Sequence, residues 1–255
     1  MNTQPYVSID LETTGLNPDT CQVLEIGAVI DDLTTDPDKL PKFRAILKHN
    51  LIEGEPYALQ MHPKLLFAIA QIPAVDGDIA DPELDPMDPV NCMFKPHKVV
   101  PRFKGWLKAH GIPVDKGFQP AGKNFANFDK PFLEAGVPNW KRDVKIKYRT
   151  IDPGNLFWWP GEEYIPDTKT CYERAGLPPE VAHTAVEDAL GVVKLVRAYK
   201  IRCIREAQMA KGFIEAFGKL QASLHPSLIV DANNPMGMAD DIIRYVQAPV
   251  LGGSS

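Results

Sequence analysis

The chain has few cysteines, no long apolar run and no internal repeat, and each absence excludes a class of protein. Its four cysteines are widely spaced and form no Cys-x-x-Cys pair, which argues against a zinc site or a disulfide framework and fits a reducing compartment. The apolar runs fall far short of the roughly 20 residues of a membrane helix. No secretory leader pattern opens the sequence. We therefore expect a cytoplasmic protein without a membrane partner.

Charge is unevenly spread along the 255 residues, although the net charge is only −5. Residues 72–100 form a Pro-rich acidic insertion, for which we expect a solvated loop without regular structure. Two basic segments follow, at residues 95–108 and 141–149, with five Lys or Arg each. Each is either a solvated face or a contact with the phosphate backbone of a nucleic acid. For the second segment the alternative use of the lysines is protection of an edge strand.

Periodicity predicts an α/β protein with one domain over residues 1–211 and a C-terminal helix with an irregular tail over 212–255. The predicted strands cover residues 6–12, 21–30, 43–48, 118–121 and 141–151. The predicted helices cover residues 58–71, 103–109, 129–135, 168–175, 185–210 and 213–220, with a regular start at Pro63 in the first of them.

Two acids stand out in the first predicted strand. Val7, Ile9 and Leu11 alternate with polar residues, so Asp10 and Glu12 project from the same face. Two carboxylates about 6.6 Å apart along a strand repel each other unless a cation lies between them. Alone, the pair would be interpreted as a solvated strand face. Further acids brought to the same place by the fold would make it a candidate site.

Two later segments supply such acids. Asp129 precedes a predicted helix that has Pro131 near its start, so its alternative role is an N-cap. Thr184 and Glu187 have the spacing of a capping box. That box puts His183 and Asp188 at the two positions that usually hold an apolar staple, and the exchange of apolar for polar residues there suggests function.

The ordered set resembles the motifs of the DEDDh 3′→5′ exonucleases, a family that includes the proofreading subunit of bacterial DNA polymerase and oligoribonuclease. The similar segments are Asp-Leu-Glu-Thr-Thr-Gly from Asp10, Leu-Glu-Ile-Gly-Ala from Leu24, Asn-Phe-Ala-Asn-Phe-Asp up to Asp129, and His-Thr-Ala-x-x-Asp-Ala from His183. Lys123 stands where many members have His, and residues 72–100 are longer than the usual connection.

The resemblance implies a ribonuclease H-like fold, with a mixed five-stranded sheet flanked by helices. It also implies hydrolysis of phosphodiester bonds from the 3′ end, with release of 5′-mononucleotides. Two divalent ions, Mg²⁺ or Mn²⁺, suit a set of hard carboxylate ligands. By resemblance the ligands are Asp10, Glu12, Asp129 and Asp188, the general base is His183, and the contacts with the terminal nucleotide are Thr13, Thr14 and Leu16. The alternative for Leu16 is a turn residue tucked into the core.

The resemblance leaves substrate and partners open. Single-stranded DNA is the preferred substrate in this interpretation, and an RNA-directed exonuclease such as an oligoribonuclease is the alternative. From another class, the chain could be a non-catalytic nucleic-acid-binding module that kept the fold. A polymerase or replication protein is a candidate partner through residues 212–255.

Overall fold

A mixed five-stranded sheet forms the centre of the fold. The computed structural model describes residues 4–75, 85–178 and 184–223. The strands are β1 (Tyr6–Thr13), β2 (Val23–Asp31), β3 (Lys42–Leu47), β4 (Met93–Phe94) and β5 (Gln119–Ala121). They lie in the order β4-β3-β2-β1-β5. β1 and β3 both run antiparallel to β2, whereas β5 runs parallel to β1 and β4 runs parallel to β3. This is the ribonuclease H-like arrangement that the sequence predicts.

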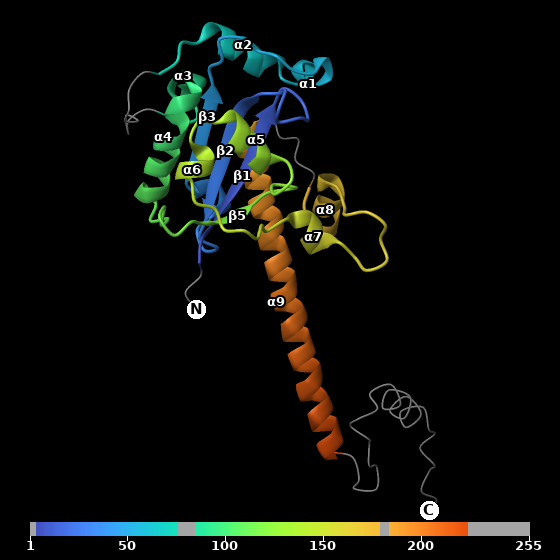
Figure 1. Ribbon diagram of the computed structural model, residues 1–255. Helices are drawn as coiled ribbons and strands as arrows, with labels where there is room; N and C mark the ends of the chain where they lie inside the picture. The colour runs from blue at the N-terminus through green and yellow to red at the C-terminus, as the bar shows by residue number, and fades with distance from the viewer. Residues whose placement is uncertain (1–3, 76–84, 179–183, 224–255) are drawn as a thin grey trace, which may run out of the picture. The chain divides into compact units, whose positions relative to one another are not determined.

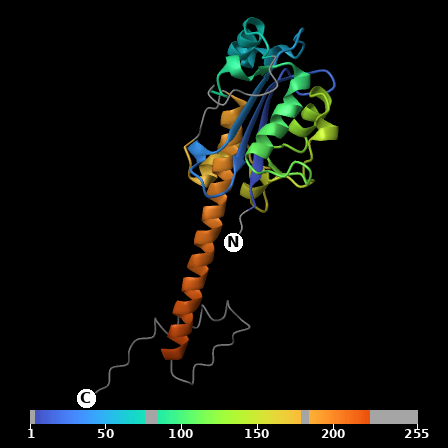
Figure 2. The same cartoon turned by 90° about the vertical axis from the view of Figure 1, so that its left-hand side faces the viewer.

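Helices cover both faces of the sheet (Figures 1 and 2). In the described part they are α1 (Pro56–Met61), α2 (Pro63–Gln71), α3 (Pro89–Cys92), α4 (Pro96–Ala109), α5 (Asp129–Gly136), α6 (Trp140–Asp143), α7 (Pro153–Phe157), α8 (Thr168–Ala175) and α9 (Ala185–Ser223), with a 3₁₀ turn at Pro37–Lys39. The apolar side chains of β1 pack into one large core with α4, α5 and α6. The opposite face carries a smaller core in which Tyr6 and Val29 meet Val193 of α9.

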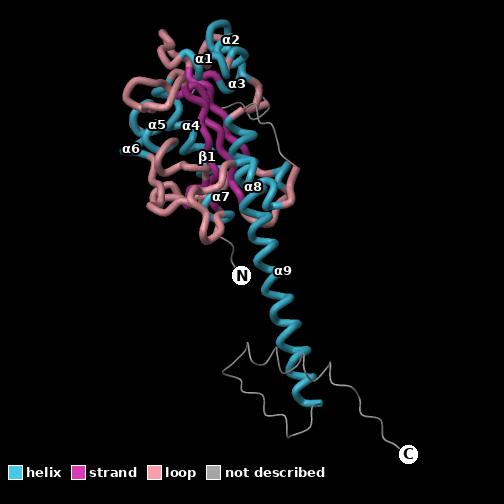
Figure 3. The backbone as a smooth tube through the Cα atoms, turned by 90° about the vertical axis from the view of Figure 1, so that its right-hand side faces the viewer, coloured by secondary structure: helices cyan, strands magenta, loops and turns pink. Residues whose placement is uncertain are grey.

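Two contacts with β2 fix the first part of α9. Gly27 has no room for a side chain, because a Cβ there would lie 2.1 Å from the carbonyl carbon of Ala185. At the C-terminal end of the same strand, Arg197 donates to the buried carboxylate of Asp31 at 3.1 Å. α7 and α8 pack beside this part of α9 through Phe157, Tyr172 and Leu195 (Figure 3).

Prolines of the 72–100 segment begin helices, whereas the sequence pattern predicts that they break regular structure. The expectation of no regular structure is wrong, because α3, β4 and the start of α4 lie there. Pro89 and Pro96 each occupy the first turn of a helix, where the missing N–H has no intrahelical partner to lose. For the same reason the helix expected over 103–109 begins at Pro96. Most of the acidic residues of the segment lie outside the described residues.

Three other boundaries differ from expectation. The helix expected over residues 58–71 is two helices, and Pro63 starts the second, as predicted. The strand expected over 141–151 is wrong: α6 is followed by an irregular segment with single bridges from Ile146 and Ile151 to the β5 edge. The expected helix over 213–220 is the continuation of α9, which runs to Ser223.

Contacts divide the chain into a unit Met1–Arg202 and a unit Cys203–Ser255. The first contains the sheet and the acids described below, and the second contains the remainder of α9 within its described part. Most of the tail expected over 212–255 lies outside the described residues. Within residues 4–75, 85–178 and 184–223, no helix is long and apolar enough to cross a bilayer.

The close approach at Gly27 gives a direct test of the packing of α9. We expect Gly27→Ala to lower the free energy of unfolding by about 1–3 kcal/mol, because the added methyl group overpacks a contact between two backbones. The matched control is Gly105→Ala, an exposed position of α4 where a Cβ meets nothing within 4 Å. That change should stabilise the protein by about 0.5–1 kcal/mol. Urea denaturation measures both, and a Gly27→Ala variant as stable as the parent would contradict the packing.

Candidate active site

Two acids of β1 face the start of α9. Asp10 and Glu12 alternate with Ile9 and Leu11, which pack into the large core, so the acids point to the opposite face. Both are half-buried. Glu12 pairs in register with Glu25 of β2, and the ladder is interrupted by a bulge directly after it. The bulge ends the regular pairing next to the acids, a common position for bulges beside functional sites.

Asp188 comes from the first turn of α9. The Oγ1 atom of Thr184 accepts the Glu187 N–H at 3.3 Å, which confirms Thr184 as the N-cap, and it donates to the Glu187 carboxylate at 3.1 Å. The Glu25 carboxylate accepts the N–H of Ala185. A carboxylate at a helix N-terminus is favourable because it satisfies a free donor and the helix dipole. Thus α9 begins at a defined point over the sheet.

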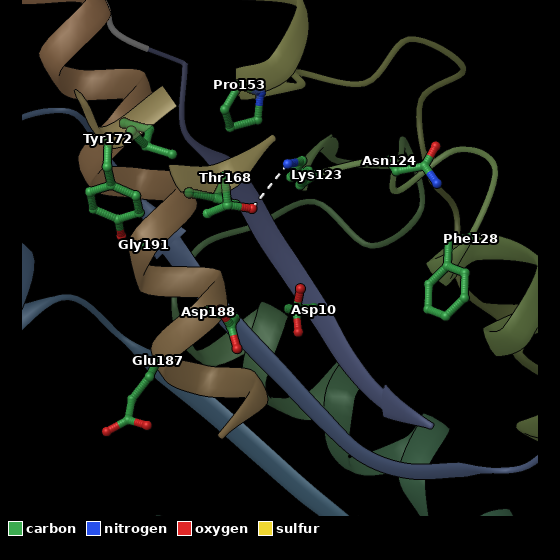
Figure 4. Close-up of a pocket in the computed structure, with 12 residues that line it drawn as sticks. Asp10, Lys123, Asn124, Phe128, Pro153, Thr168, Tyr172, Glu187, Asp188 and Gly191 are labelled. Carbon is green, nitrogen blue, oxygen red and sulfur yellow. Dashed lines mark hydrogen bonds between the residues drawn. The ribbon is translucent and has the colours of Figure 1, made fainter. Parts of the chain in front are cut away.

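The three acids converge at this point. One oxygen atom from each of Asp10, Glu12 and Asp188 lies within 4.8 Å of the other two. Figure 4 shows Asp10 and Asp188 reaching toward each other from β1 and α9. Three carboxylates at this separation form a set of hard oxygen ligands that could hold a divalent cation.

Asp129 lies at the edge of the same strand. It is the first residue of α5 and only 3% exposed, and its carboxylate accepts the backbone N–H of Leu11. Phe128 occupies the cap position without a side-chain cap bond, so the alternative of Asp129 as an N-cap is wrong. Asp129 is outside the group of three oxygens above but close enough to raise the pKa of Asp10.

Burial and mutual repulsion raise the pKa values of these acids. The pKa of Asp10 is raised by burial first, and then by the charges of Asp129, Asp188 and Glu12. Burial, with Asp188 and Glu25, raises the pKa of Glu12 to about 7. Burial also raises the pKa of Asp129. A bound cation would offset this repulsion and favour the ionised forms, so these residues fit a metal site chemically.

A cavity of about 320 Å³ opens beside Asp10 and Asp188. The loop residues Lys123 and Asn124 line one side, and α8 and α9 line another (Figure 4). Lys123 Nζ donates to Thr168 Oγ1 at 3.0 Å, so this lysine joins the loop to α8. The cavity thus adjoins Asp10 and Asp188 and has one lysine in its lining.

The three residues expected to contact a nucleotide differ in exposure. Thr14 is fully buried, and its hydroxyl donates to Glu53 O at 2.7 Å and accepts from Gln22 N–H at 2.8 Å. Thr13 is 8% exposed and donates to Gly15 O. Leu16 is 74% exposed, so the alternative of a core position for Leu16 is wrong. Its side chain is available to a ligand.

Three nearby residues were missed by sequence reasoning. Glu25, the cross-strand neighbour of Glu12, is buried and receives two hydrogen bonds from Arg44, at 3.0 and 3.2 Å. His62, between α1 and α2, has Nε2 3.5 Å from Glu12 Oε2, and burial lowers its pKa. The strand pattern around Glu25 could have suggested its face, but no local pattern connects His62 to Glu12. The predicted base, His183, lies outside the described residues.

The fold has relatives among solved nucleases. E. coli exonuclease I, solved with a dT13 oligonucleotide, superposes with a TM-score of 0.50 at 12% identity over 81% of this chain and 43% of that one. Cell-death related nuclease 4 gives 0.46 at 15% identity over 77% and 63%, and a full-length 3′-exonuclease gives 0.48 at 11% over 81% and 84%. The chain thus spans less than two thirds of the length of the first two.

These likenesses concern the fold. The chain is structurally similar to the DnaQ-like 3′-exonucleases and has their ribonuclease H-like sheet. No protein-family model matches the sequence, and no curated protein matches it either. The acids Asp10, Glu12 and Asp188 gather at one end of β1 on that fold.

The raised pKa values predict how the metal-free protein responds to pH. The buried carboxyls hold their protons in the folded state and release them in the unfolded chain, so the folded state binds more protons. In EDTA the free energy of unfolding should therefore fall as pH rises from about 5 to 8, through the unfolded and then the folded pKa values. Urea titrations at several pH values measure this slope.

Two comparisons sharpen the measurement. Asp129→Asn should flatten the slope, whereas the exposed Asp115→Asn should leave it unchanged. Added Mg²⁺ or Mn²⁺ should restore stability at pH 8 because a cation offsets the repulsion. A metal-free stability that rises between pH 5 and 8 would show that the acids are not held together as described.

Proposed function

We propose that the chain is a metal-dependent 3′→5′ exonuclease that hydrolyses phosphodiester bonds and releases 5′-mononucleotides. The observation that carries this proposal is the meeting of Asp10, Glu12 and Asp188, with oxygens within 4.8 Å of one another, on a ribonuclease H-like sheet. Structural acids are normally dispersed or paired with bases, because like charges cost free energy when buried. Their retention in a cluster is best explained by a cationic ligand.

The proposed roles follow from the positions of the side chains. Asp10, Glu12 and Asp188, together with Asp129, would hold two Mg²⁺ or Mn²⁺ ions. Such ions activate a water molecule and stabilise charge on the leaving 3′ oxygen. Glu25, fixed by Arg44, keeps the start of α9 and hence Asp188 in position. His62 Nε2 lies 3.5 Å from the Glu12 carboxylate, so a protonated His62 would pair with it.

A nucleic-acid strand with a free 3′ end is the proposed substrate, and single-stranded DNA is preferred. Exonuclease I, whose fold is similar, was solved with a DNA oligonucleotide. Substrate contacts by Thr13, Thr14 and Leu16 stay predictions, with Leu16 the exposed member. The RNA-directed alternative and the non-catalytic module differ in measurable ways: the first shortens RNA in preference to DNA, and the second binds strands without shortening them.

Isosteric removal of one acid tests the proposal. A 5′-labelled single strand with Mg²⁺ or Mn²⁺ should give a ladder that shortens from the 3′ end. Asp10→Asn and Glu12→Gln should each lower the rate by about 10³-fold or more, since several kcal/mol of charge stabilisation are lost. Both variants should stay folded or gain stability, because a repulsion is removed. Asp115→Asn is the matched control.

Metal binding gives a readout independent of activity. Mn²⁺ titrated into the protein and followed by electron paramagnetic resonance should bind to the parent and weakly or not at all to Asp10→Asn. Absence of shortening with either metal, on DNA and on RNA, would refute the enzymatic proposal.

His183 is proposed as the general base on the strength of the sequence resemblance. His183→Ala should lower kcat by about 10² to 10⁴-fold, the usual contribution of such a group, while Mn²⁺ binding changes little. A His with a reference pKa of about 6.5 gives an acidic limb in the pH–rate profile. That limb should disappear in the variant. An unchanged limb would assign the titration to another group, such as Glu12.

A further inference from the structure

The segment after α6 is pinned to the sheet but bulges between its fixed points. Phe118 bridges to Ile146 and Ala121 bridges to Ile151, both in parallel. From Phe118 to Ala121 the chain advances by three residues, but from Ile146 to Ile151 it advances by five. The second segment therefore has two residues more than can pair with the first. Extra residues between fixed points loop outward, as in a β-bulge.

Backbone bonds hold the bulge in place. Lys147 N–H donates to Phe118 O at 2.9 Å, and Ile151 N–H donates to Pro120 O at 3.0 Å. The side chain of Gln119 donates to the carbonyl of Arg149. The bulge therefore presents its side chains from an anchored backbone.

The bulge displays an aromatic ring to solvent. Tyr148 is 95% exposed, although a single exposed aromatic on a surface is common and proves little. Tyr148 also lines a hollow together with residues of a second segment. A hollow of about 360 Å³, the Tyr148 hollow, is lined by Lys147, Tyr148 and Thr150 on one side and by residues 124–127 on the other.

The charges of the Tyr148 hollow suit a polyanion. Lys147 lines it, as does Lys130, which also lies 3.7 Å from Glu134. The acid in its wall is Asp152, whose carboxylate already accepts the N–H groups of Asn124, at 2.9 Å, and Gly154, at 2.8 Å. The lining thus carries two lysines against this one carboxylate, which the two N–H donors stabilise.

The Tyr148 hollow adjoins the cavity that contains Asp10 and Asp188. Asn124 lines both, and its N–H bond to Asp152 fixes it in a left-handed conformation with φ 55°. In Figure 4, Asn124 lies on the side of the cavity beside Asp10 and Asp188 that faces away from α9. A strand whose 3′ end reaches the acids can continue past Asn124 into the Tyr148 hollow.

We propose that the Tyr148 hollow binds the nucleotides on the 5′ side of the scissile bond, with Tyr148 stacking on an unpaired base and Lys147 contacting a backbone phosphate. This inference rests on the proposed function and names the form of its substrate. Bases of a duplex are stacked inside the helix and offer no free face, whereas every base of a single strand does. The hollow is therefore a single-strand site, open to any base sequence.

The test compares substrates that reach the hollow with one that does not. The p-nitrophenyl ester of thymidine 5′-monophosphate has no strand on the 5′ side, and oligothymidylates of increasing length do. For Tyr148→Ala, KM for the longer oligomers should rise by about 5- to 100-fold, the effect of losing one stacked base. Hydrolysis of the ester should be unchanged.

Matched variants separate stacking and charge from general damage. Tyr148→Phe keeps the ring and should behave as the parent, and Tyr164→Ala removes another exposed tyrosine, 75% exposed, as a control. Lys147→Gln should reduce the log–log salt slope of strand binding by about 0.7, the value for one phosphate contact. The exposed Lys39→Gln should leave that slope unchanged.

The results distinguish this inference from the proposed function. An unchanged KM for Tyr148→Ala at every length overturns the inference, as does an equal loss on the ester. If the parent hydrolyses neither substrate, the proposed function fails. Fluorescence anisotropy of a labelled strand without metal then decides the inference alone: weaker binding by Tyr148→Ala supports it, and equal binding refutes it. Repeating these measurements with oligouridylates shows whether the hollow accepts RNA as well as DNA.

Discussion

The repulsion among carboxyl groups at one end of β1 is the constraint on which the rest of the structure depends. Asp10 is surrounded by Asp129, Asp188 and Glu12, and burial adds to the cost of ionising it. Such a cluster spreads apart unless the elements that carry it are fixed by other interactions. The acids come from β1, α5 and α9, so each element needs its own anchor.

The anchors are found around the acids. For α9 they are the close approach of Gly27 to Ala185, the cap by Thr184 and the ion pair between Arg197 and Asp31. Glu25 has a double role, because the same buried carboxylate that binds Arg44 accepts an N–H of the first turn of α9. Apart from the Thr184 cap, these contacts involve β2, which carries none of the proposed metal ligands. Stability elsewhere in the sheet thus maintains an unfavourable arrangement at the site.

The sequence predicts those parts of the site whose side chains are positioned by a short repeating pattern within one strand or one helix. Alternation in β1 places Asp10 and Glu12 on one face, and the spacing of Thr184 and Glu187 places Asp188 in the first turn of a helix. The prediction of a strand over residues 141–151 fails because the same alternation of residues also occurs in an irregular segment. Val144, Ile146 and Tyr148 alternate as in a strand, yet Ile146 makes a single bridge and Tyr148 is exposed. Contacts between distant segments, such as His62 with Glu12, have no local signal at all.

Asp152 connects the two cavities and the acids in a way that no motif suggests. Its carboxylate caps α7 through Gly154 N–H and fixes the left-handed Asn124 through a second N–H. Its charge also contributes to the raised pKa of Asp129. The loop of Asn124 forms walls of both the cavity beside Asp10 and Asp188 and the Tyr148 hollow. One carboxylate therefore sets the backbone where a strand would pass between the hollows, and at the same time increases the negative charge that a metal ion would neutralise. If the chain acts as proposed, the placement of a strand and the binding of a metal would be coupled through this side chain, because Asp152 bonds the N–H of Asn124 and its charge acts on Asp129.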